Sequence, residues 1–423
     1  MSAVRIVVTG VGTISPLGLN ARRHFERLNA GESAVETLDD PAYRNYPPLV
    51  RAAVHDFDRR VFVPDRMLRK LLSPSPAFAL AAAAEALRDA GMAGTDLTEC
   101  GLYAGSVCLD ADPEAFIPAL RESVDATNNL NLSRFATHGI LLVDPLFLVK
   151  SLPNAGLCGI AIQYQVLGPN ANITNGSVSG LQAVIAAMDA LRRGEAEMGL
   201  AGGYDTLLRM DCIVDHLLAG RLAGNSMPPM QACRPFDRRR SGYALAEGAA
   251  FLVLETLERA RRRHATIYGE LLTTGQNALA RNLLDRTPHD EGLTACAQQA
   301  LGADGGARNV DLVLGDGLAN PVDDERELCA YRALFPDGRV PFSVFTGSFG
   351  FPGAAAGAFS LVHAMLAIRY GVLPPTINCD EPVDAGDVDL VSTARPAQPR
   401  RVLVWTSDRG IKNAAVVAAA FES

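Results

Sequence analysis

The sequence predicts an α/β protein with largely parallel β-sheets, built as two similar halves. Short runs of β-branched and apolar residues alternate with segments whose apolar residues recur at helical spacing. After a basic segment at 259–263 the same order of strands and helices starts again. No low-complexity segment or long proline- or serine-rich linker interrupts the chain. We therefore expect residues 1–254 and 255–423 to form two halves of one fused body.

The first half opens with a run of β-branched residues. Residues 4–8 (VRIVV) are apolar apart from one arginine and are closed by Thr9-Gly10, which predicts a buried parallel strand followed by a turn. Residues 77–90 are rich in alanine, and Leu181, Val184 and Met188 recur at helical spacing. The predicted strands of this half are 4–8, 101–107, 171–174, 198–201 and 249–254, and the predicted helices are 77–90 and 181–191.

The second half repeats the alternation at a coarse level. A basic helix around 259–263 leads into it, and a long apolar helix is expected close to the C-terminal strands. The predicted strands are 271–273, 310–314, 402–405 and 414–420, and the predicted helices are 294–301, 324–334 and 356–368.

Composition excludes several classes of function. The 423 residues carry a formal net charge of −8, so no basic face is expected for nucleic acid. Eight scattered cysteines, without paired or metal-ligand spacing, predict reduced thiols of a cytoplasmic protein with no metal and no cofactor. We expect a soluble chain with no membrane partner, because no signal peptide opens the sequence and its apolar runs are too short to cross a bilayer.

Four blocks of the sequence carry a resemblance to a known family. Residues 174–180 (TNGSVSG) match a strand-to-helix turn of the type T-A-C-x-S-G, and residues 233–249 contain CRPFD, a glycine and EGA. Residues 316–327 begin DGLANP where the pattern is H-G-T-x-T-P, and residues 346–378 contain TGS, a Gly/Ala-rich run and PPTIN. In order and spacing these blocks resemble the β-ketoacyl-acyl carrier protein synthases, and the match covers nearly the whole chain. The resemblance implies a thiolase-like fold, with two pseudo-repeated βαβ halves in αβαβα layers.

The same blocks depart from the family at its catalytic positions. The nucleophilic cysteine of the pattern falls on Ser177, and its two histidines fall on Asp316 and Ser348. The family lysine, three residues before the threonine of T-G-H, falls on Ser343. Lysine occurs at only three positions in the chain, and the nearest in sequence is Lys412, outside this block.

These changes remove what the condensing reaction needs. A thiolate at a helix N-terminus has a lowered pKa and can take an acyl chain, whereas a serine hydroxyl stays protonated unless a general base contacts it. Two neutral imidazoles polarise the thioester and stabilise the enolate. Asp316, if ionised, would repel that enolate, and Ser348 could donate only one weak hydrogen bond. We therefore expect no catalytic residue here and a filled former pocket, with Asp316 as a structural turn or cap rather than a base.

A ketosynthase-like chain without these groups is similar to the chain-length factor, or ketosynthase β, of type II polyketide synthases. Residues 409–414, with Arg-Gly followed by Asn-Ala, also resemble that group, although its members commonly have glutamine where Ser177 stands. The resemblance implies a heterodimer with an active ketosynthase, which extends an acyl chain on acyl carrier protein. It also places Phe147 and Leu148 in a segment that crosses the interface and reaches the acyl tunnel. Phe147 would limit that tunnel, or else be a core aromatic.

Two other functions stay open. Ser177 could serve a stand-alone acyltransferase or hydrolase, although no G-x-S-x-G pattern surrounds it and no histidine follows in the matching blocks. A homodimeric protein that binds acyl chains is the third possibility. The arginine runs 238–240 and 259–263 are either solvated faces or, for one of them, a docking surface for the acidic carrier protein.

Overall fold

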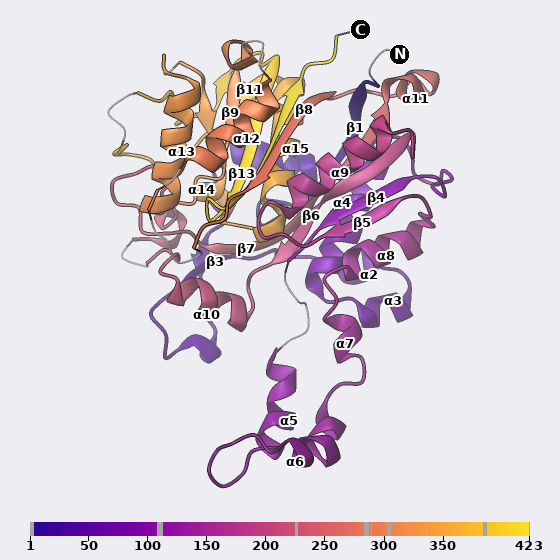
Figure 1. Ribbon diagram of the computed structural model, residues 1–423, viewed down its shortest axis with the longest axis vertical. Helices are drawn as coiled ribbons and strands as arrows, with labels where there is room; N and C mark the ends of the chain where they lie inside the picture. Colours follow the sequence, from indigo (N-terminus) through magenta and orange to yellow (C-terminus); the bar gives the residue numbers. More distant parts are fainter. Residues whose placement is uncertain are drawn as a thin grey trace.

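The computed structural model describes residues 4–107, 113–224, 227–282, 287–288, 290–302, 306–337, 339–383 and 387–422. Its main feature is one sheet of twelve strands (Figure 1). These strands are β1 (Ile6–Ile14), β2 (Glu36–Thr37), β3 (Val50–Ala52), β4 (Gly101–Gly105), β5 (Asn170–Ile173), β6 (Met198–Thr206), β7 (Leu245–Thr256), β8 (Gly269–Ala278), β9 (Leu312–Leu314), β10 (Phe342–Ser343), β13 (Arg401–Asp408) and β14 (Lys412–Ala419). A separate pair is formed by β11 (Val372–Leu373) and β12 (Arg395–Pro396).

The order of the strands repeats between the two halves of the chain. The main path through the sheet is β10-β9-β13-β14-β8-β1-β7-β6-β4-β5. When the five strands of the first half are numbered by their order along the chain, they lie side by side in the order third, second, fourth, fifth, first. These strands are β5, β4, β6, β7 and β1. In the second half β10, β9, β13, β14 and β8 follow the same order. The repeated topology predicted from the sequence is confirmed at the level of the sheet.

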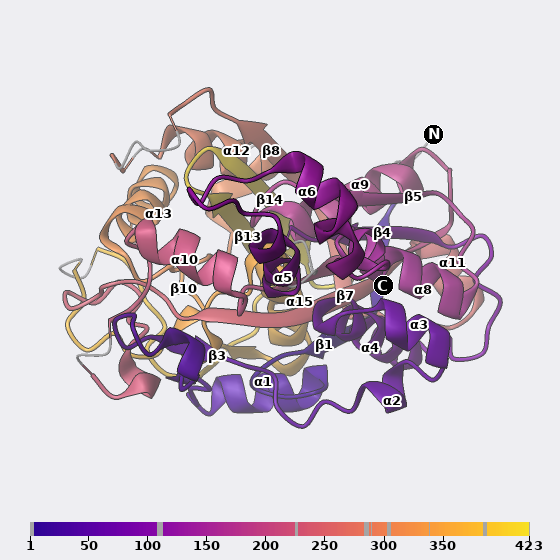
Figure 2. The same cartoon turned by 90° about the horizontal axis from the view of Figure 1, so that it is seen from below.

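Helices enclose and separate the two sets of strands. They are α1 (Ala21–Asn29), α2 (Arg59–Phe62), α3 (Arg66–Leu71), α4 (Pro74–Asp89), α5 (Ile117–Glu122), α6 (Leu132–Thr137), α7 (Phe147–Lys150), α8 (Ala155–Tyr164), α9 (Ser179–Arg192), α10 (Met210–Leu218), α11 (Leu257–Arg262), α12 (Glu291–Leu301), α13 (Pro321–Leu334), α14 (Thr346–Phe349) and α15 (Ala356–Tyr370). Helices α9 and α15 contact each other and strands of both halves. Seen from below, α4 and α8 lie at one side of the molecule and α12 and α13 at the other (Figure 2). The predicted αβαβα layering is confirmed.

The direction of the strands differs from the prediction. The sheet is mixed rather than largely parallel, because β1 pairs antiparallel with both β7 and β8. The turn predicted at Thr9-Gly10 is wrong, since β1 runs on to Ile14. The glycines serve helix packing instead: a Cβ placed on Gly12 would lie 2.1 Å from the carbonyl oxygen of Ala82 in α4. Glycine here allows close approach of a helix.

The segment 113–152 was not assigned any helix from the sequence, and it forms an arm that projects from the body (Figure 1). The arm carries α5, α6 and α7, and Phe116, Phe135 and Phe147 form a small aromatic cluster inside it. Many of its other apolar side chains face solvent; Leu132 is 71% exposed and Leu141 is 79% exposed. This part of the sequence therefore lacks the amphipathic pattern of helices that pack on a core, which is why no helix was predicted here.

Two arginine runs have structural roles that the sequence analysis did not foresee. In α11 and just after it, Arg259 and Arg263 contact the fully buried carboxylate of Glu255, with Nε–Oε2 distances of 3.1 and 2.9 Å. Arg240 Nε lies 3.4 Å from Oδ2 of the buried Asp324. Since a buried carboxylate is costly without a cation, these arginines stabilise the fold rather than form open basic faces.

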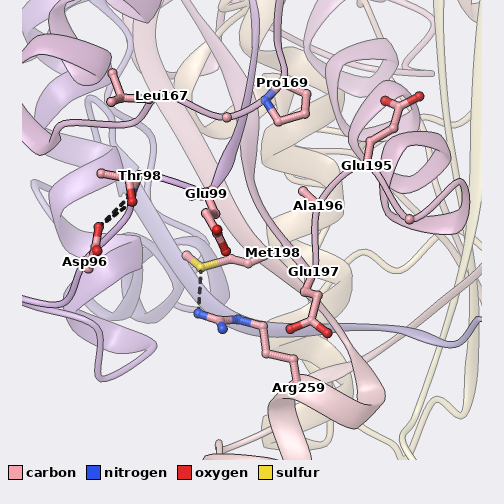
Figure 3. Close-up of a pocket in the computed structure, with 13 residues that line it drawn as sticks. Asp96, Thr98, Glu99, Leu167, Pro169, Glu195, Ala196, Glu197, Met198 and Arg259 are labelled. Carbon is pink, nitrogen blue, oxygen red and sulfur yellow. Dashed lines mark hydrogen bonds between the residues drawn. The ribbon is translucent and has the colours of Figure 1, made fainter.

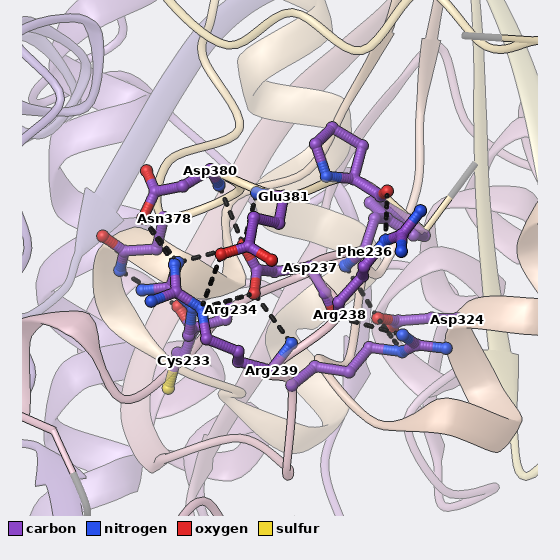
Figure 4. A network of polar contacts seen from close by, with 12 residues as sticks. Cys233, Arg234, Phe236, Asp237, Arg238, Arg239, Asp324, Asn378, Asp380 and Glu381 are labelled. Atoms are coloured by element: carbon purple, nitrogen blue, oxygen red, sulfur yellow. Dashed lines mark hydrogen bonds and ion pairs between the residues drawn. The ribbon is translucent and has the colours of Figure 1, made fainter. Parts of the chain in front are cut away.

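The CRPFD motif joins two distant loops. The buried Arg234 donates to Asp237 Oδ2 at 3.0 Å and to Asp380 Oδ2 at 2.6 Å (Figure 4). Asp237 also accepts hydrogen bonds of 2.9 Å from the backbone N–H groups of Asp380 and Glu381. The motif therefore stabilises the packing of residues 380–381 against residues 234–237.

In the part of the chain that the structure describes, none of the helices has the length and apolar character required to cross a membrane.

Two histidines are buried against each other in the core. His24 of α1 and His363 of α15 are linked by a contact of 2.7 Å between their Nε2 atoms, and His24 Nδ1 lies 2.6 Å from Ser15 Oγ. Phe345, Phe349 and the rest of an aromatic cluster surround them. Burial, together with the charge of Arg27, lowers the pKa of His24 to about 3. Burial and the neighbouring His24 lower the pKa of His363 well below its ordinary value.

This pair predicts loss of stability in acid. An unfolded histidine binds a proton below about pH 6.5, whereas the folded pair stays neutral, so stability is complete above that pH and falls as the pH drops toward 3. We expect the free energy of unfolding to fall by about 1.4 kcal/mol per pH unit for each histidine. Urea denaturation from pH 7.5 to 4.5 measures this, and the double change His24→Phe, His363→Phe should flatten the profile. An equally steep profile in the double variant would contradict the assignment.

Candidate functional site

The candidate site lies where β5 turns into α9. Ser177 occupies this elbow, two residues before the helix begins, and is mostly buried. Gly176 precedes it with φ of +76°, a conformation that favours glycine, and a Cβ there would lie 2.0 Å from Asp408 Oδ2. The elbow is therefore packed against the hairpin between β13 and β14. This geometry agrees with the strand-to-helix turn predicted from the sequence.

The hydroxyl of Ser177 is not activated. Its Oγ donates to the carbonyl oxygen of Ser407 at 3.3 Å. Among the described residues no histidine, lysine or carboxylate makes a hydrogen bond to this oxygen. The nearby Asp408 forms an ion pair of 3.3 Å with Lys412. A serine without a base contact stays a neutral alcohol at neutral pH.

Asp316 lies in the loop between β9 and α13, and its carboxyl group is hydrogen-bonded to β13. Its Oδ2 accepts hydrogen bonds from the hydroxyl of Thr406 at 3.1 Å and from the backbone N–H of Ser407 at 2.7 Å. Asp316 and Ser177 therefore both contact Ser407, the first at its nitrogen and the second at its carbonyl oxygen. The structural role expected for Asp316 agrees with these contacts.

The surroundings of Asp316 favour its neutral form. Its carboxyl group is buried, and burial together with the carboxyl group of Glu327 raises the pKa of Asp316 well above its ordinary value. Glu327 holds the same loop, because it accepts hydrogen bonds from the backbone N–H groups of Asp316 and Gly317 at 2.9 and 2.7 Å. Trp405 Nε1 donates to it as well, at 2.7 Å. The carboxyl groups of Asp316 and Glu327 therefore both fix the loop of residues 315–317.

The two remaining positions have different surroundings. Ser343, in β10, donates to the carbonyl oxygen of Pro374 at 2.5 Å. Ser348, in α14, is fully buried, and its Oγ finds no hydrogen-bond partner among the described residues. Neither of them lines the cavity beside Ser177. The structure joins Ser177 and Asp316 through Ser407. The segments with Ser343 and Ser348 also contact the Asp316 loop, because Gly315 donates to the carbonyl oxygen of Ser343 at 3.2 Å and the hydroxyl of Thr346 in α14 donates to the carbonyl oxygen of Asp316.

The pocket beside Ser177 is open, which corrects the expectation that it is filled. It has a volume of about 550 Å³. Small residues leave this space, since Gly176, Gly353 and Ala354 form part of its wall. Helix α10 contributes four polar residues to the cavity, none of which the sequence analysis singled out: Asp211, Cys212, Asp215 and His216. Asp211 and Asp215 are four residues apart, as are Cys212 and His216, so each pair lies on one face of the helix. This spacing is the signal in the sequence that could have revealed them.

A second, larger cavity lies at the opposite end of the strands. It has a volume of about 800 Å³ and borders the first residues of β4, β5 and β6 (Figure 3). Asp96, Glu99, Glu195 and Glu197 give it an acidic rim. Arg259 crosses it to donate to Met198 Sδ at 3.5 Å. Because the elbow follows the other end of β5, this cavity is distinct from the Ser177 cavity.

Phe147 and Leu148 belong to the arm and not to the cavity. The ring of Phe147 lies 5.1 Å from that of Phe116, between centroids, inside the aromatic cluster of the arm. Leu148 is 76% exposed. Within the single chain, Phe147 is thus a small-core aromatic and Leu148 is a surface residue.

Comparison with known families identifies the fold. Residues 3–260 match the beta-ketoacyl synthase N-terminal domain, and residues 268–380 match the beta-ketoacyl synthase C-terminal domain. The chain belongs to the β-ketoacyl synthase family. The resemblance found in the four sequence blocks is confirmed at this level.

Curated relatives include a 3-oxoacyl-[acyl-carrier-protein] synthase and a polyketide β-ketoacyl synthase. A 3-oxoacyl-[acyl-carrier-protein] synthase 2 of Coxiella burnetii is 30% identical over 396 residues, which cover 92% of each chain. The oxytetracycline polyketide β-ketoacyl synthase 1 of Streptomyces rimosus is 30% identical over 434 residues, covering 98% of this chain and 97% of the relative.

Solved structures show the same ketosynthase fold. The ishigamide ketosynthase/chain length factor has a TM-score of 0.87 at 24% identity, with both chains covered completely. AntDE:AntF, a type II polyketide synthase carrier protein in complex with its hexaketide-bound ketosynthase, has a TM-score of 0.84 at 23% identity, again over both whole chains. The thiolase-like fold is therefore established for this chain.

The contacts of Asp316 predict how its variants behave. Asp316→Ala leaves the Thr406 hydroxyl and the Ser407 N–H without an acceptor, which should cost about 3 kcal/mol of unfolding free energy. Asp316→Asn keeps an acceptor oxygen in the same shape and should cost about 1 kcal/mol or less. Urea denaturation of both variants measures the difference. Equal losses for the two changes would show that Asp316 does not act through these hydrogen bonds.

Proposed function

We propose that this chain is a chain-length-factor-like subunit that has the ketosynthase fold but performs no condensation itself. The observation that carries the proposal is the bonding of the Ser177 hydroxyl, which donates to a backbone carbonyl and contacts no base. The carboxyl group of Asp316 is likewise used to hold Thr406 and Ser407. The groups that would form a thioester and stabilise an enolate are therefore missing from the elbow.

The proposed partner is an active ketosynthase that extends a polyketide or polyene chain on an acyl carrier protein. The arm supports this proposal, because it exposes large apolar side chains that a lone chain would leave in water, among them Leu132, Leu141 and Leu148. Exposed apolar side chains gathered on one segment are typical of protein–protein interfaces. We propose that the arm packs on the partner and that Phe147 and Leu148 contribute to the wall of the acyl tunnel.

One observation favours a second candidate, a stand-alone acyltransferase or hydrolase that uses Ser177. His216 lines the same cavity and is the candidate general base for the Ser177 hydroxyl. Its Nδ1 is already 2.9 Å from the hydroxyl of Tyr243, and the described contacts include no hydrogen bond between His216 and Ser177. The chain-length-factor-like role therefore agrees better with the geometry.

Substitution of Ser177 separates the two candidates. In the purified complex with an active ketosynthase, Ser177→Ala should leave the product yield within about twofold, because Ser177 has no base. Ser177→Cys in the isolated chain should produce no condensation, since no imidazole pair contacts the elbow. Product quantification and mass spectrometry of acylated peptides provide the measurement. An acyl group trapped on Ser177, or a tenfold loss of product in Ser177→Ala, would favour the hydrolase.

Substitutions in the arm test the interface. Leu148→Asp places a charge on the proposed contact and should dissociate the complex on a sizing column. Val61→Asp, at a 69% exposed residue of α2, is the matched control and should leave the complex intact. Survival of the complex in Leu148→Asp would exclude this part of the arm from the interface.

Phe147→Ala tests the tunnel wall. The change removes a ring from the Phe116 cluster and opens space, in which each added methylene of an acyl chain gains about 0.8 kcal/mol of burial. We expect longer products from an intact complex. Unchanged products from an intact complex would reject a role in chain length, and dissociation would show that Phe147 holds the arm or its interface.

A further inference from the structure

Helix α1 lies at the surface of the molecule and is anchored by a buried histidine. In the view from below, it runs along the edge of the fold (Figure 2). Arg22 and Glu26 face solvent, whereas His24, Phe25 and Leu28 are buried. A helix of nine residues is too short to be stable in water by itself. Its place on the fold therefore depends on these inward-facing contacts.

The buried histidine is docked as a neutral ring. Its Nδ1 lies 2.6 Å from Ser15 Oγ, and its Nε2 lies 2.7 Å from Nε2 of His363. One proton lies between the two Nε2 atoms, because protonation of both rings would place two N–H groups against each other. The rings of Phe349 and Phe359 lie against His24, and among the described residues no carboxylate hydrogen-bonds to either imidazole. The docked pair therefore offers no compensation for an added positive charge.

The neighbouring groups on α1 and α15 do not supply that compensation. Arg27, one turn after His24, is itself positive and donates to Glu32 at 2.6 Å. Burial and the charge of Arg27 both lower the pKa of His24. Tyr370 of α15 stacks on the ring of Phe25, with the centroids 6.0 Å apart. The face between the two helices is thus aromatic and carries no anion for the pair.

A carboxyl group of α4 holds the start of α1. Glu85 accepts hydrogen bonds from the backbone N–H groups of Ala21 and Thr13, at 2.7 and 2.8 Å. Burial raises the pKa of Glu85 to about 7, an effect that the neighbouring Asp89 strengthens and Arg88 weakens. Detachment of α1 that brings water to Glu85 would therefore release a proton from it at mildly acidic pH.

The chain that follows α1 holds α14 in place. Ser33 Oγ donates to the carbonyl oxygen of Gly347 at 3.0 Å, and the backbone N–H of Ala34 donates to the carbonyl oxygen of Ser348 at 2.7 Å. On its other side, α14 is held by the hydroxyl of Thr346, which donates to the carbonyl oxygen of Asp316. Movement of α1 is therefore transmitted to one of the two attachments of α14.

We propose that α1 is an acid-released latch: when His24 and His363 take up protons, α1 detaches and residues 33–34 release α14, while the sheet stays folded. The inference goes beyond the proposed function, because it assigns a conformational switch to this chain and needs no partner. In the open form each histidine binds a proton below about pH 6.5, whereas the docked pair stays neutral. The open population therefore rises as the pH falls below that value, by about a hundredfold per pH unit for two protons. Release of one proton from Glu85 reduces this to about tenfold.

Hydrogen exchange of the full-length protein from pH 7.5 to 4.5 tests the latch, with each rate corrected for intrinsic exchange at that pH. Amides of residues 21–29 should lose protection about tenfold to a hundredfold per pH unit below about pH 6, and amides of residues 346–351 should follow. Helix α12, which packs on β8 and β14, is the internal reference and should stay at least about tenfold more protected at every pH. Equal protection of α1 and α12 would overturn the proposal, because α1 would then open only with the whole fold. Protection of α1 that does not change with pH, or an α14 that stays protected, would overturn it as well.

Histidine variants assign the pH dependence to the pair. The double change His24→Phe, His363→Phe should make the protection of α1 independent of pH to within about threefold. His55→Phe, at an exposed histidine outside the core, is the matched control and should keep the dependence. A double variant that folds and keeps the full dependence would contradict the role of the pair.

Cleavage at Glu26 provides a second readout that needs no substitution in the core. Glu26 lies within α1, so a glutamate-specific protease can cut there only when the helix has detached. The rate, divided by that for a free peptide of residues 20–32, should rise at least about tenfold from pH 6 to pH 5. Cleavage at the exposed Glu258 of α11, treated in the same way, should not rise with it. A constant relative rate at Glu26 would overturn the proposal.

Discussion

Close contact between backbones at the N-terminus of α9 is the constraint on which the rest of the structure depends. A Cβ on Gly105 of β4 would lie 2.3 Å from the backbone nitrogen of Gly180, and one on Gly203 of β6 would lie 2.7 Å from the carbonyl oxygen of Ala354. Only glycine allows these strands, α9 and the turn before α15 to meet. Because α9 and α15 separate the two sets of strands, this contact sets the spacing of the layers and the position of Ser177.

The scaffold and the chemistry of the site are separable in this chain. The elbow, the glycine contacts and the carboxyl group of Glu327 under the 315–317 loop are all present. At the positions aligned with the nucleophile, one of the histidines and the lysine, the side chains of Ser177, Asp316 and Ser343 hydrogen-bond to neighbouring chain segments. Membership of the β-ketoacyl synthase family therefore accounts for the architecture, and the proposed loss of condensation depends on the side chains at these positions.

Charge and apolar surface are distributed in a way that suits an assembly. The carboxylates of Glu255 and Asp324 are buried and contacted by arginines, so part of the basic character of the arginine runs is used inside the fold. The large exposed apolar residues gather instead on the arm, which extends away from the body (Figure 1). An arm of this kind contributes little to the core of its own chain, and its apolar side chains gain burial only against another molecule.

The sequence by itself determined the α/β class, most of the strands and helices of both halves and the family, because periodicity and ordered motifs are local properties of the chain. The four substituted catalytic positions stay a prediction from the same motifs. Tertiary structure decided the antiparallel course of β1, the arginine contacts to Glu255, the open cavity and the contact between His216 and Tyr243. The reason is separation along the chain: Ser177 meets Ser407 across 230 residues, and Asp316 meets it across 91. Such pairings follow from how the two halves pack, and no local pattern encodes them.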